Sequence, residues 1–268
     1  MKIVTWNVNS LKARQPYVEA FLDEVQPDIL AIQELKLTEE NVPKEMFASR
    51  GYHLAIHAQK QWNGVLIASK KEIHDIHGGL PQGDEEQARL VACTIEGIRF
   101  VNLYCPQGEK ETSDKYQYKL RFFDRLISWL SEVSHPDQPL VLLGDINIAP
   151  HPHDVYWDTQ EHPNWVSHHP LELQRFASLL DWGLENLGDT LLKPGDFSFF
   201  DYRSFWDYAS RRYRYDLGMR IDHFLATKSV VARAKSMETL RPWRHKKYGH
   251  KPSDHVPVLL TLADAESC

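Results

Sequence analysis

The chain has 268 residues, 42% of them hydrophobic and 25% charged, which is typical of a globular protein and excludes an intrinsically disordered one. Three cysteines are too few for a disulfide framework, and no apolar run reaches the roughly 20 residues that span a bilayer. The formal net charge of −6 excludes a chain that is basic throughout, but the aromatic-rich stretches 203–220 and 241–251 are locally basic and compatible with one basic face. Because the N-terminus lacks a signal-peptide pattern, we expect a reducing, cytoplasmic location.

In the first half of the chain, apolar periodicity predicts mainly strands, with two helices among them. The expected strands are 2–8, 28–35, 53–59, 64–69, 89–95 and 99–104. The expected helices are 16–25, which stops before Pro27, and the acidic stretch 39–50. Glu96 and Gly97 separate the last two strands, so we expect a tight turn there.

The second half of the chain begins with the strongest helix pattern, 115–133, in which apolar residues recur with the helical period. A buried strand at 140–143, a long loop at 150–170 and a helix at 171–180 follow, and further strands are expected at 197–201, 220–226, 232–240 and 256–262. No repeat or linker divides the chain, so we expect a single domain over residues 1–268. The pattern favours an α/β fold of two packed sheets flanked by helices.

The stretch LVLLGDINIAP, Leu140–Pro150, carries the clearest chemical signal. Asp145 and Asn147 follow the buried strand two positions apart, and on an extended backbone such residues point to the same side. An Asp placed there can activate a water while an Asn amide donates to a phosphate oxygen. An Asx-turn that merely ends the strand would explain the same two residues.

Polar residues end several other predicted strands in the same way. They are Asn7 and Asn9, Glu34, Tyr104 to Gln107, and Ser253 to His255, and Arg220 with Asp222 open a further strand. Taken singly, each has an ordinary alternative, such as a surface acid for Glu34 or a core cap for Tyr104. Taken together, they predict metal-assisted phosphodiester hydrolysis, with Glu34 as a carboxylate for Mg²⁺ and Asp222 orienting His255. Zinc-ligand spacings and a nucleotide-binding Gly-Lys-Ser/Thr loop are both absent from the sequence.

Six motifs carry a resemblance to a known family: WNVNSLKAR, DILAIQELK, YCPQGE, LLGDINIAP, DYRS followed by GMRIDHFLAT, and KPSDHVPV. In this order they resemble exonuclease III-type AP endonucleases of the endonuclease/exonuclease/phosphatase superfamily. The resemblance implies a four-layer αββα sandwich and a monomer that uses Mg²⁺, with Mn²⁺ as a substitute. It also implies cleavage 5′ to abasic sites in duplex DNA, together with 3′→5′ exonuclease and 3′-phosphatase activity.

The same resemblance assigns roles to single residues. Asn7, Glu34 and Asp254 match the metal side of the site. The catalytic positions are matched by Tyr104, which contacts the phosphate or leaving oxygen, Asp145, which activates water, Asn147, which binds the phosphoryl group, and the pair Asp222 and His255. Arg89, Gln107 and Lys119 match positions near the DNA path.

The chain departs from the family pattern at two places. Phe199 stands where many relatives have Trp, which keeps an aromatic wall but puts the strength of the exonuclease in question. The segment 204–218 is longer than usual and contains Trp206, Arg211 and Arg212. This segment is either a solvated loop with a local hydrophobic plug or a wedge that inserts into duplex DNA.

Two other functions stay open from the sequence. One keeps the same site but acts on a substrate other than DNA, because superfamily relatives hydrolyse inositol phosphates or sphingomyelin. The other is a non-catalytic nucleic-acid-binding protein that kept the fold. The basic aromatic segment 204–218 favours DNA over lipids, and the full set of candidate catalytic residues favours an enzyme.

Overall fold

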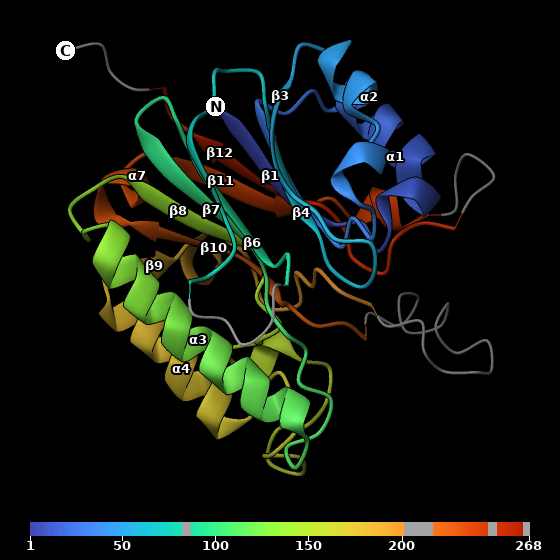
Figure 1. Ribbon diagram of the computed structural model, residues 1–268. Coiled ribbons are helices and arrows are strands. Elements are labelled where there is room, and N and C mark those ends of the chain that lie inside the picture. Colours follow the sequence, from blue (N-terminus) through green and yellow to red (C-terminus); the bar gives the residue numbers. More distant parts are fainter. Residues whose placement is uncertain (82–86, 201–216, 246–250, 265–268) are drawn as a thin grey trace.

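A computed structural model describes residues 1–81, 87–200, 217–245 and 251–264. Its strands form two six-stranded sheets that pack face to face (Figure 1). The first sheet has the order β11-β12-β1-β2-β4-β3, and the second has the order β5-β6-β7-β8-β10-β9. Within the described residues, no helix is long and apolar enough to cross a membrane.

The bounds of the elements are as follows. The first sheet contains β1 (Lys2–Asn7), β2 (Ile29–Gln33), β3 (His53–His57), β4 (Val65–Ser69), β11 (Ala234–Thr239) and β12 (Val258–Leu262). The second contains β5 (His74–Gly78), β6 (Leu90–Ile95), β7 (Ile98–Tyr104), β8 (Leu140–Asp145), β9 (Leu184–Asn186) and β10 (Asp222–Thr227). The helices are α1 (Leu11–Glu24), α2 (Lys44–Ala48), α3 (Asp114–Val133), α4 (Pro170–Asp181), α5 (Gly188–Leu191) and α7 (Lys228–Val231).

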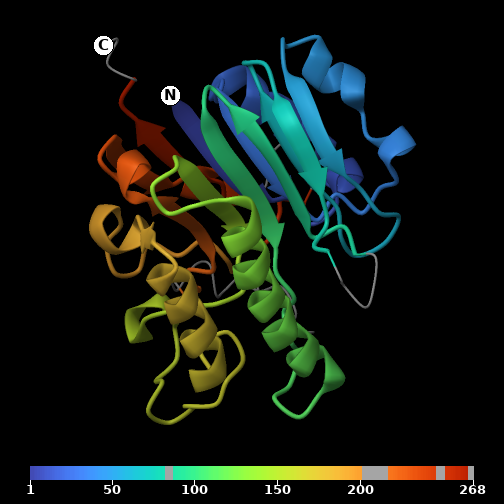
Figure 2. The ribbon, with the colours of Figure 1, turned by 60° about the vertical axis from the view of Figure 1, so that its left-hand side comes forward.

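Three hydrophobic clusters fill the interfaces between the layers. One lies between the sheets and joins residues such as Ile29 and Val258 of the first sheet to Phe100 and Phe224 of the second. The second lies between the first sheet and α1 and α2, and the third between the second sheet and α3 and α4 (Figure 2). The expected four-layer αββα sandwich of two mixed sheets is therefore confirmed.

The two central strands of each sheet are parallel, and these strand pairs position the site. β1 runs parallel to β2 with Asn7 opposite Gln33, and β7 runs parallel to β8 with Tyr104 opposite Asp145. Parallel strands end at the same edge, so residues that follow them gather there. Gly144 permits the close approach of β7 and β8, because a Cβ atom there would lie 2.1 Å from the Leu103 carbonyl oxygen.

Some local predictions were wrong. The acidic stretch 39–50 is not one helix: Glu39–Asn41 forms a 3₁₀ turn, and α2 begins only after Pro43, which interrupts the helical pattern. The described part of 197–201 forms isolated bridges at Phe199 instead of a strand. The short edge strands β5 and β9 were not predicted, because β5 is mostly exposed and lacks an apolar period.

Candidate active site

The strand ends of both sheets surround one cavity of about 730 Å³. Most of the residues predicted for the site line it, namely Glu34, Tyr104, Gln107, Asp145, Asn147, Phe199, Asp254 and His255. Asn7 and Asp222 lie directly behind this wall and contact its residues. Trp206, Arg211 and Arg212 lie outside the described residues.

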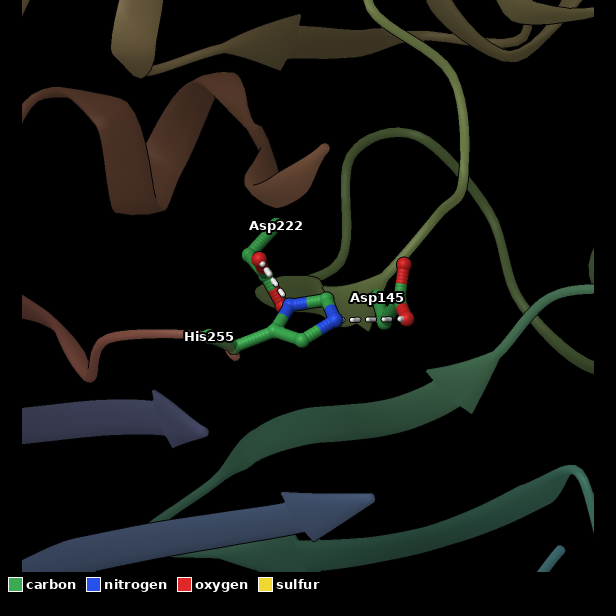
Figure 3. A group of neighbouring side chains, drawn as sticks. All are labelled: Asp145, Asp222 and His255. Carbon is green, nitrogen blue, oxygen red and sulfur yellow. Dashed lines mark hydrogen bonds and ion pairs between the residues drawn. The ribbon is translucent and has the colours of Figure 1, made fainter. Parts of the chain in front are cut away.

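Asp222, His255 and Asp145 form a row at the edge of the second sheet (Figure 3). His255 Nδ1 lies 2.8 Å from Asp222 Oδ2, and its Nε2 lies 3.8 Å from Asp145 Oδ2. Burial alone would lower the pKa of His255, but the two carboxylates outweigh burial and raise it well above its usual value. The ring is therefore an imidazolium at neutral pH, and the predicted contact of Asp222 with His255 is confirmed.

Asp145 is almost completely buried, and its environment raises the pKa of its carboxyl group to about 7. Burial is the largest cause of its raised pKa, with the charges of Asp222 and Glu34 acting in the same direction. His255 and a hydrogen bond from Asn7 partly oppose this rise. A carboxylate whose pKa lies closer to neutrality is a stronger base, which suits a residue that must take a proton from water.

Asn7 connects the two sheets at the site. Its Nδ2 donates to Glu34 Oε1 and to Asp145 Oδ2, both at 2.9 Å, so one amide holds an acid of each sheet. Glu34 also pairs with Lys36 at 2.7 Å. Lys36 in turn donates to Asn9, whose Nδ2 contacts both carboxylate oxygens of Asp254. The residues expected on the metal side therefore lie in one connected group.

The donor set fits a divalent cation. Glu34 and Asp254 supply the oxygen ligands that Mg²⁺ prefers. Burial is the largest cause of the raised pKa of Asp145, and the nearby negative charges of Asp222 and Glu34 add to it. The buried Oδ1 of Asp222 has no hydrogen-bond partner within the described residues. Asp145, Asp222 and His255 lie close enough to share an ion, but both nitrogens of His255 already face carboxylates. A cation therefore fits better on the Glu34 side of the cavity.

Asn147 reaches the cavity by a different route from the one expected. Its backbone is not extended but left-handed, with φ of 55°, and its N–H donates to Asp145 Oδ1 at 3.1 Å. This is an Asx-turn, which the sequence left as an alternative. The extended backbone expected through Asp145 and Asn147 was therefore wrong, although both residues line the same cavity.

Tyr104 ends β7 with its hydroxyl group facing the acids of the site. Burial is the largest cause of its strongly raised pKa, and Glu34 and Asp145 raise it further. The hydroxyl therefore stays protonated and can donate a hydrogen bond. Arg89 lies over the Tyr104 ring at 5.0 Å and donates to its carbonyl oxygen. Arg89 is not among the described residues that line the cavity. It therefore affects the site through its contact with Tyr104.

Lys119 does not lie where a DNA contact would need it. Its side chain is fully buried and pairs with Glu172 at 2.5 Å, behind the cavity wall. Gln107 is exposed on the cavity, and the Phe199 ring packs against His255 at 4.7 Å between centroids. The exposure of Gln107 is compatible with the expected place near a DNA path, which stays a prediction, whereas the burial of Lys119 keeps its ammonium away from the surface.

Several residues of the site escaped the sequence argument. Ser198 accepts hydrogen bonds from the N–H groups of Ile221 and Asp222, and Lys36 pairs with Glu34. Trp62 is 72% exposed on the cavity rim, and no role was predicted for it. A useful signal was the Asn-Gly pair after Trp62, which marks a turn between two strands. Ser198 had no comparable signal, because its role depends on chain segments that meet only in the fold.

Strained backbone concentrates at this cavity. Eleven described non-glycine residues have positive φ, and seven of them line the cavity: Asn9, Glu34, Lys36, Trp62, Glu109, Asn147 and Ser167. A residue in such a conformation costs roughly 1–3 kcal/mol and persists only where its surroundings hold it. Strain of this kind is typical of a preorganised functional site.

Comparison with known proteins agrees with this geometry. Residues 4–255 match the model of the endonuclease/exonuclease/phosphatase family. The chain belongs to this family. It is 31% identical to exodeoxyribonuclease III of Haemophilus influenzae, over 96% of this chain and 98% of that protein.

Two solved structures are also similar to the chain. A 3′ phosphatase from Neisseria bound to a product DNA hairpin is 36% identical, with a TM-score of 0.89 and coverage of 98% of this chain and 100% of that one. An AP endonuclease from Archaeoglobus fulgidus is 34% identical, with a TM-score of 0.89 and coverage of 98% and 99%. The expected exonuclease III-type membership, and with it an enzyme of this type, is confirmed.

Proposed function

We propose that this protein is a Mg²⁺-dependent DNA-repair phosphodiesterase that cleaves 5′ to abasic sites in duplex DNA. We include 3′→5′ exonuclease and 3′-phosphatase activity in the proposal, and action as a cytoplasmic monomer. The observation that carries it is the row Asp222, His255 and Asp145, joined through Asn7 to Glu34 inside one cavity. This arrangement supplies a base, a cation and a metal-binding acid at one point in space.

Each residue of the row has a step in the proposed reaction. Asp145 orients a water and takes its proton as the water attacks the phosphorus. His255 is an imidazolium because Asp222 and Asp145 face it, so it donates to a phosphoryl oxygen as charge develops there. The carboxamide of Asn147 donates to another oxygen. A divalent ion held by Glu34, with Asn7 and Asp254 nearby, would supply further neutralisation of the phosphate charge.

In this proposal, Tyr104 interacts with the leaving oxygen. Its pKa is raised far above neutrality, so the phenol keeps its proton and can donate a hydrogen bond to the departing group. Arg89 stacks on the ring and fixes its orientation. Nucleophilic attack by Tyr104 is disfavoured for the same reason, because the phenolate is not populated.

The shape and lining of the cavity support a nucleic-acid substrate. Cations of the rim, Arg14, Lys36, Lys110 and Lys251, suit a phosphate backbone. The aromatic residues Trp62, Trp157 and Trp165 line the same opening and suit nucleobases or sugars. The activities by which the similar proteins are named, AP endonuclease and 3′ phosphatase, are those that we propose for this chain.

The purified protein with Mg²⁺ tests the proposal on four substrates. These are a duplex with one abasic site, an undamaged recessed 3′ end, a 3′-phosphate end and an inositol phosphate. We expect incision of the abasic duplex and release of inorganic phosphate from the 3′-phosphate end, both lost in Asp145→Asn. Hydrolysis of inositol phosphate alone would move the site to another substrate class. DNA binding without any cleavage would identify a non-catalytic binding protein.

A further inference from the structure

Lys119 lies at the junction of two helices and two loops that carry site residues. It comes from α3, and its fully buried ammonium pairs with the fully buried Glu172 of α4 at 2.5 Å. The same ammonium donates to the carbonyl oxygens of Asn147 at 2.7 Å and Gln107 at 3.2 Å. The ammonium thus contacts one helix through an ion pair and the loops that follow β7 and β8 through two hydrogen bonds.

Stability alone gives little reason for this pair. Taking two charges out of water is costly, and replacing a buried ion pair by apolar residues of similar volume is often neutral or stabilising. The neighbouring contact between the same helices, Arg175 with Asp124 at 3.2 Å, is at the surface and avoids this cost. A fully buried Lys119 is therefore better explained by what its hydrogen bonds hold in place.

What they hold is the strained turn that carries Asn147. With φ of 55°, this residue needs its surroundings to keep its conformation. Its N–H binds Asp145 Oδ1 and its Nδ2 donates to the Cys105 carbonyl oxygen at 2.8 Å. Lys119 supplies the remaining backbone restraint, because it binds the carbonyl oxygen of Asn147. Together these bonds fix the direction of the carboxamide.

The packing around Lys119 extends this restraint to the rim of the cavity. A Cβ atom on Gly108 would lie 3.2 Å from Lys119 Cδ, so the loop after β7 rests against the lysine stem. Glu172 also accepts from the N–H of His169, whose ring packs on Tyr116 and lies 3.4 Å from Glu111. Glu111 lines the cavity. The ion pair therefore connects α3 and α4 to the site loops.

We propose that Lys119 is a positioning residue for phosphodiester hydrolysis. With Glu172 as its counter-ion, it holds the Asn147 turn and the Gln107 loop so that the Asn147 carboxamide faces the phosphoryl oxygen. This inference rests on the proposed role of Asn147. It replaces the expected contact of Lys119 with DNA, which burial of the side chain excludes in this conformation.

The test uses variants that remove the buried charges together. Lys119→Met/Glu172→Gln leaves no unpaired buried ion, and Lys119→Gln/Glu172→Gln restores one polar donor at position 119. The matched control is Arg175→Met/Asp124→Asn, which breaks the surface pair between the same two helices without touching the loops. Melting temperature, kcat and KM are measured for each protein with Mg²⁺ and a 3′-phosphate duplex.

We expect kcat of the Met variant to fall about 10- to 100-fold while KM changes little, because a small misplacement of a site group costs up to about 10²-fold. The Gln variant should recover part of kcat even where it is the less stable of the two, and the control should match wild type. If kcat merely followed the melting temperature across these proteins, Lys119 would be a structural residue and the inference would be overturned.

A double-mutant cycle with Asn147→Ala separates this inference from the proposed function. In the Asn147→Ala background, removing Lys119 should cost little further activity, because the group that it positions is already absent. An equal loss in both backgrounds would overturn the inference. An impaired Asn147→Ala beside a fully active Met variant would overturn it while leaving the proposed role of Asn147 intact. A fully active Asn147→Ala would overturn both.

Discussion

Asp145 is the residue on which the two sheets converge. Asn7 of the first sheet donates to one of its carboxylate oxygens, and the N–H of Asn147 donates to the other. The ring of His255 faces the same carboxylate from a third chain segment. These contacts orient the group, while burial raises its pKa. A change of charge at this position should therefore affect the chemistry more than the packing.

Asp145→Asn and His255→Asn are expected to lower kcat by roughly 10²–10⁴-fold, because each removes a positioned group that transfers a proton or donates to developing charge. Both replacements keep the approximate shape of a polar group. Thermal unfolding and DNA binding should therefore stay near wild type. Activity assays beside melting curves measure this, and a loss of activity only in proportion to lost folded protein would favour a structural role.

Glu34→Gln is expected to change the response to metal. Glu34 is the acid of the first sheet at the cavity, and it pairs with Lys36 and Asn7. The neutral amide keeps a hydrogen-bonding oxygen but loses the charge that attracts Mg²⁺. The midpoint of a Mg²⁺ titration of activity should rise, with partial recovery in excess metal. The assignment of Glu34 to the metal would fail if wild type and variant gave the same titration curve.

Long apolar runs in the sequence allowed the fold to be predicted. β1, β2, β7, β8 and α3 were all expected close to their observed bounds, because each buries several apolar residues in sequence. The strand-end residues then followed from topology, since parallel strands deliver their ends to one edge. Short or exposed elements such as β5 carry too little burial to mark a sequence.

The parts of the site that sequence reasoning missed depend on contacts between distant segments. Lys119 lies in α3, an amphipathic helix in which a Lys is expected on the exposed face. Its burial is explained only by its ion pair with Glu172, which the fold brings next to it. Asn147 was placed correctly for a wrong reason, because the Asx-turn after β8 replaces the extended backbone. The local sequence pattern therefore identified which residues belong to the site, whereas their contacts could be seen only in the folded structure.

Gly144→Ala should be among the more destabilising single substitutions in the second sheet. Gly144 has φ of 131°, and an added Cβ would lie 2.1 Å from Leu103 O, a backbone atom that cannot move without disturbing β7. Strained backbone and overpacking each cost roughly 1–3 kcal/mol. We expect a loss of about 3 kcal/mol or more in the free energy of unfolding, measured by denaturant titration.

Gly97→Ala provides the matched control for this prediction. Gly97 has φ of 76° in the two-residue turn between β6 and β7, and an added Cβ there would meet nothing within 4 Å. Only the backbone strain remains, so the expected loss is about 1–2 kcal/mol. Equal losses in the two variants would show that the approach of β7 to β8 tolerates a side chain at Gly144.

Charge is distributed unevenly over the protein surface. The chain has a formal net charge of −6, yet the exposed Lys110 and Lys251 line the cavity. Lys70 and Lys71 lie at the opposite edge, because Ser69 pairs with Ile29 at the start of β2 whereas Val65 pairs with Gln33 beside the site. Long-range repulsion of a polyanion by the whole protein must be overcome by local cations at the binding face.

The salt dependence of DNA binding should therefore distinguish the faces. Lys110→Ala/Lys251→Ala is expected to weaken binding to duplex DNA and to reduce the slope of log K against log salt by about two, since each lost phosphate contact removes about one. Lys70→Ala/Lys71→Ala removes the same charge from the far edge and should leave the slope unchanged. Arg211→Ala/Arg212→Ala, outside the described residues, tests the predicted DNA contact of segment 204–218 by the same measurement. A slope equal to wild type in this last variant would favour the interpretation of segment 204–218 as a solvated loop. Slopes equal to wild type in all three variants would show that DNA binds to another face.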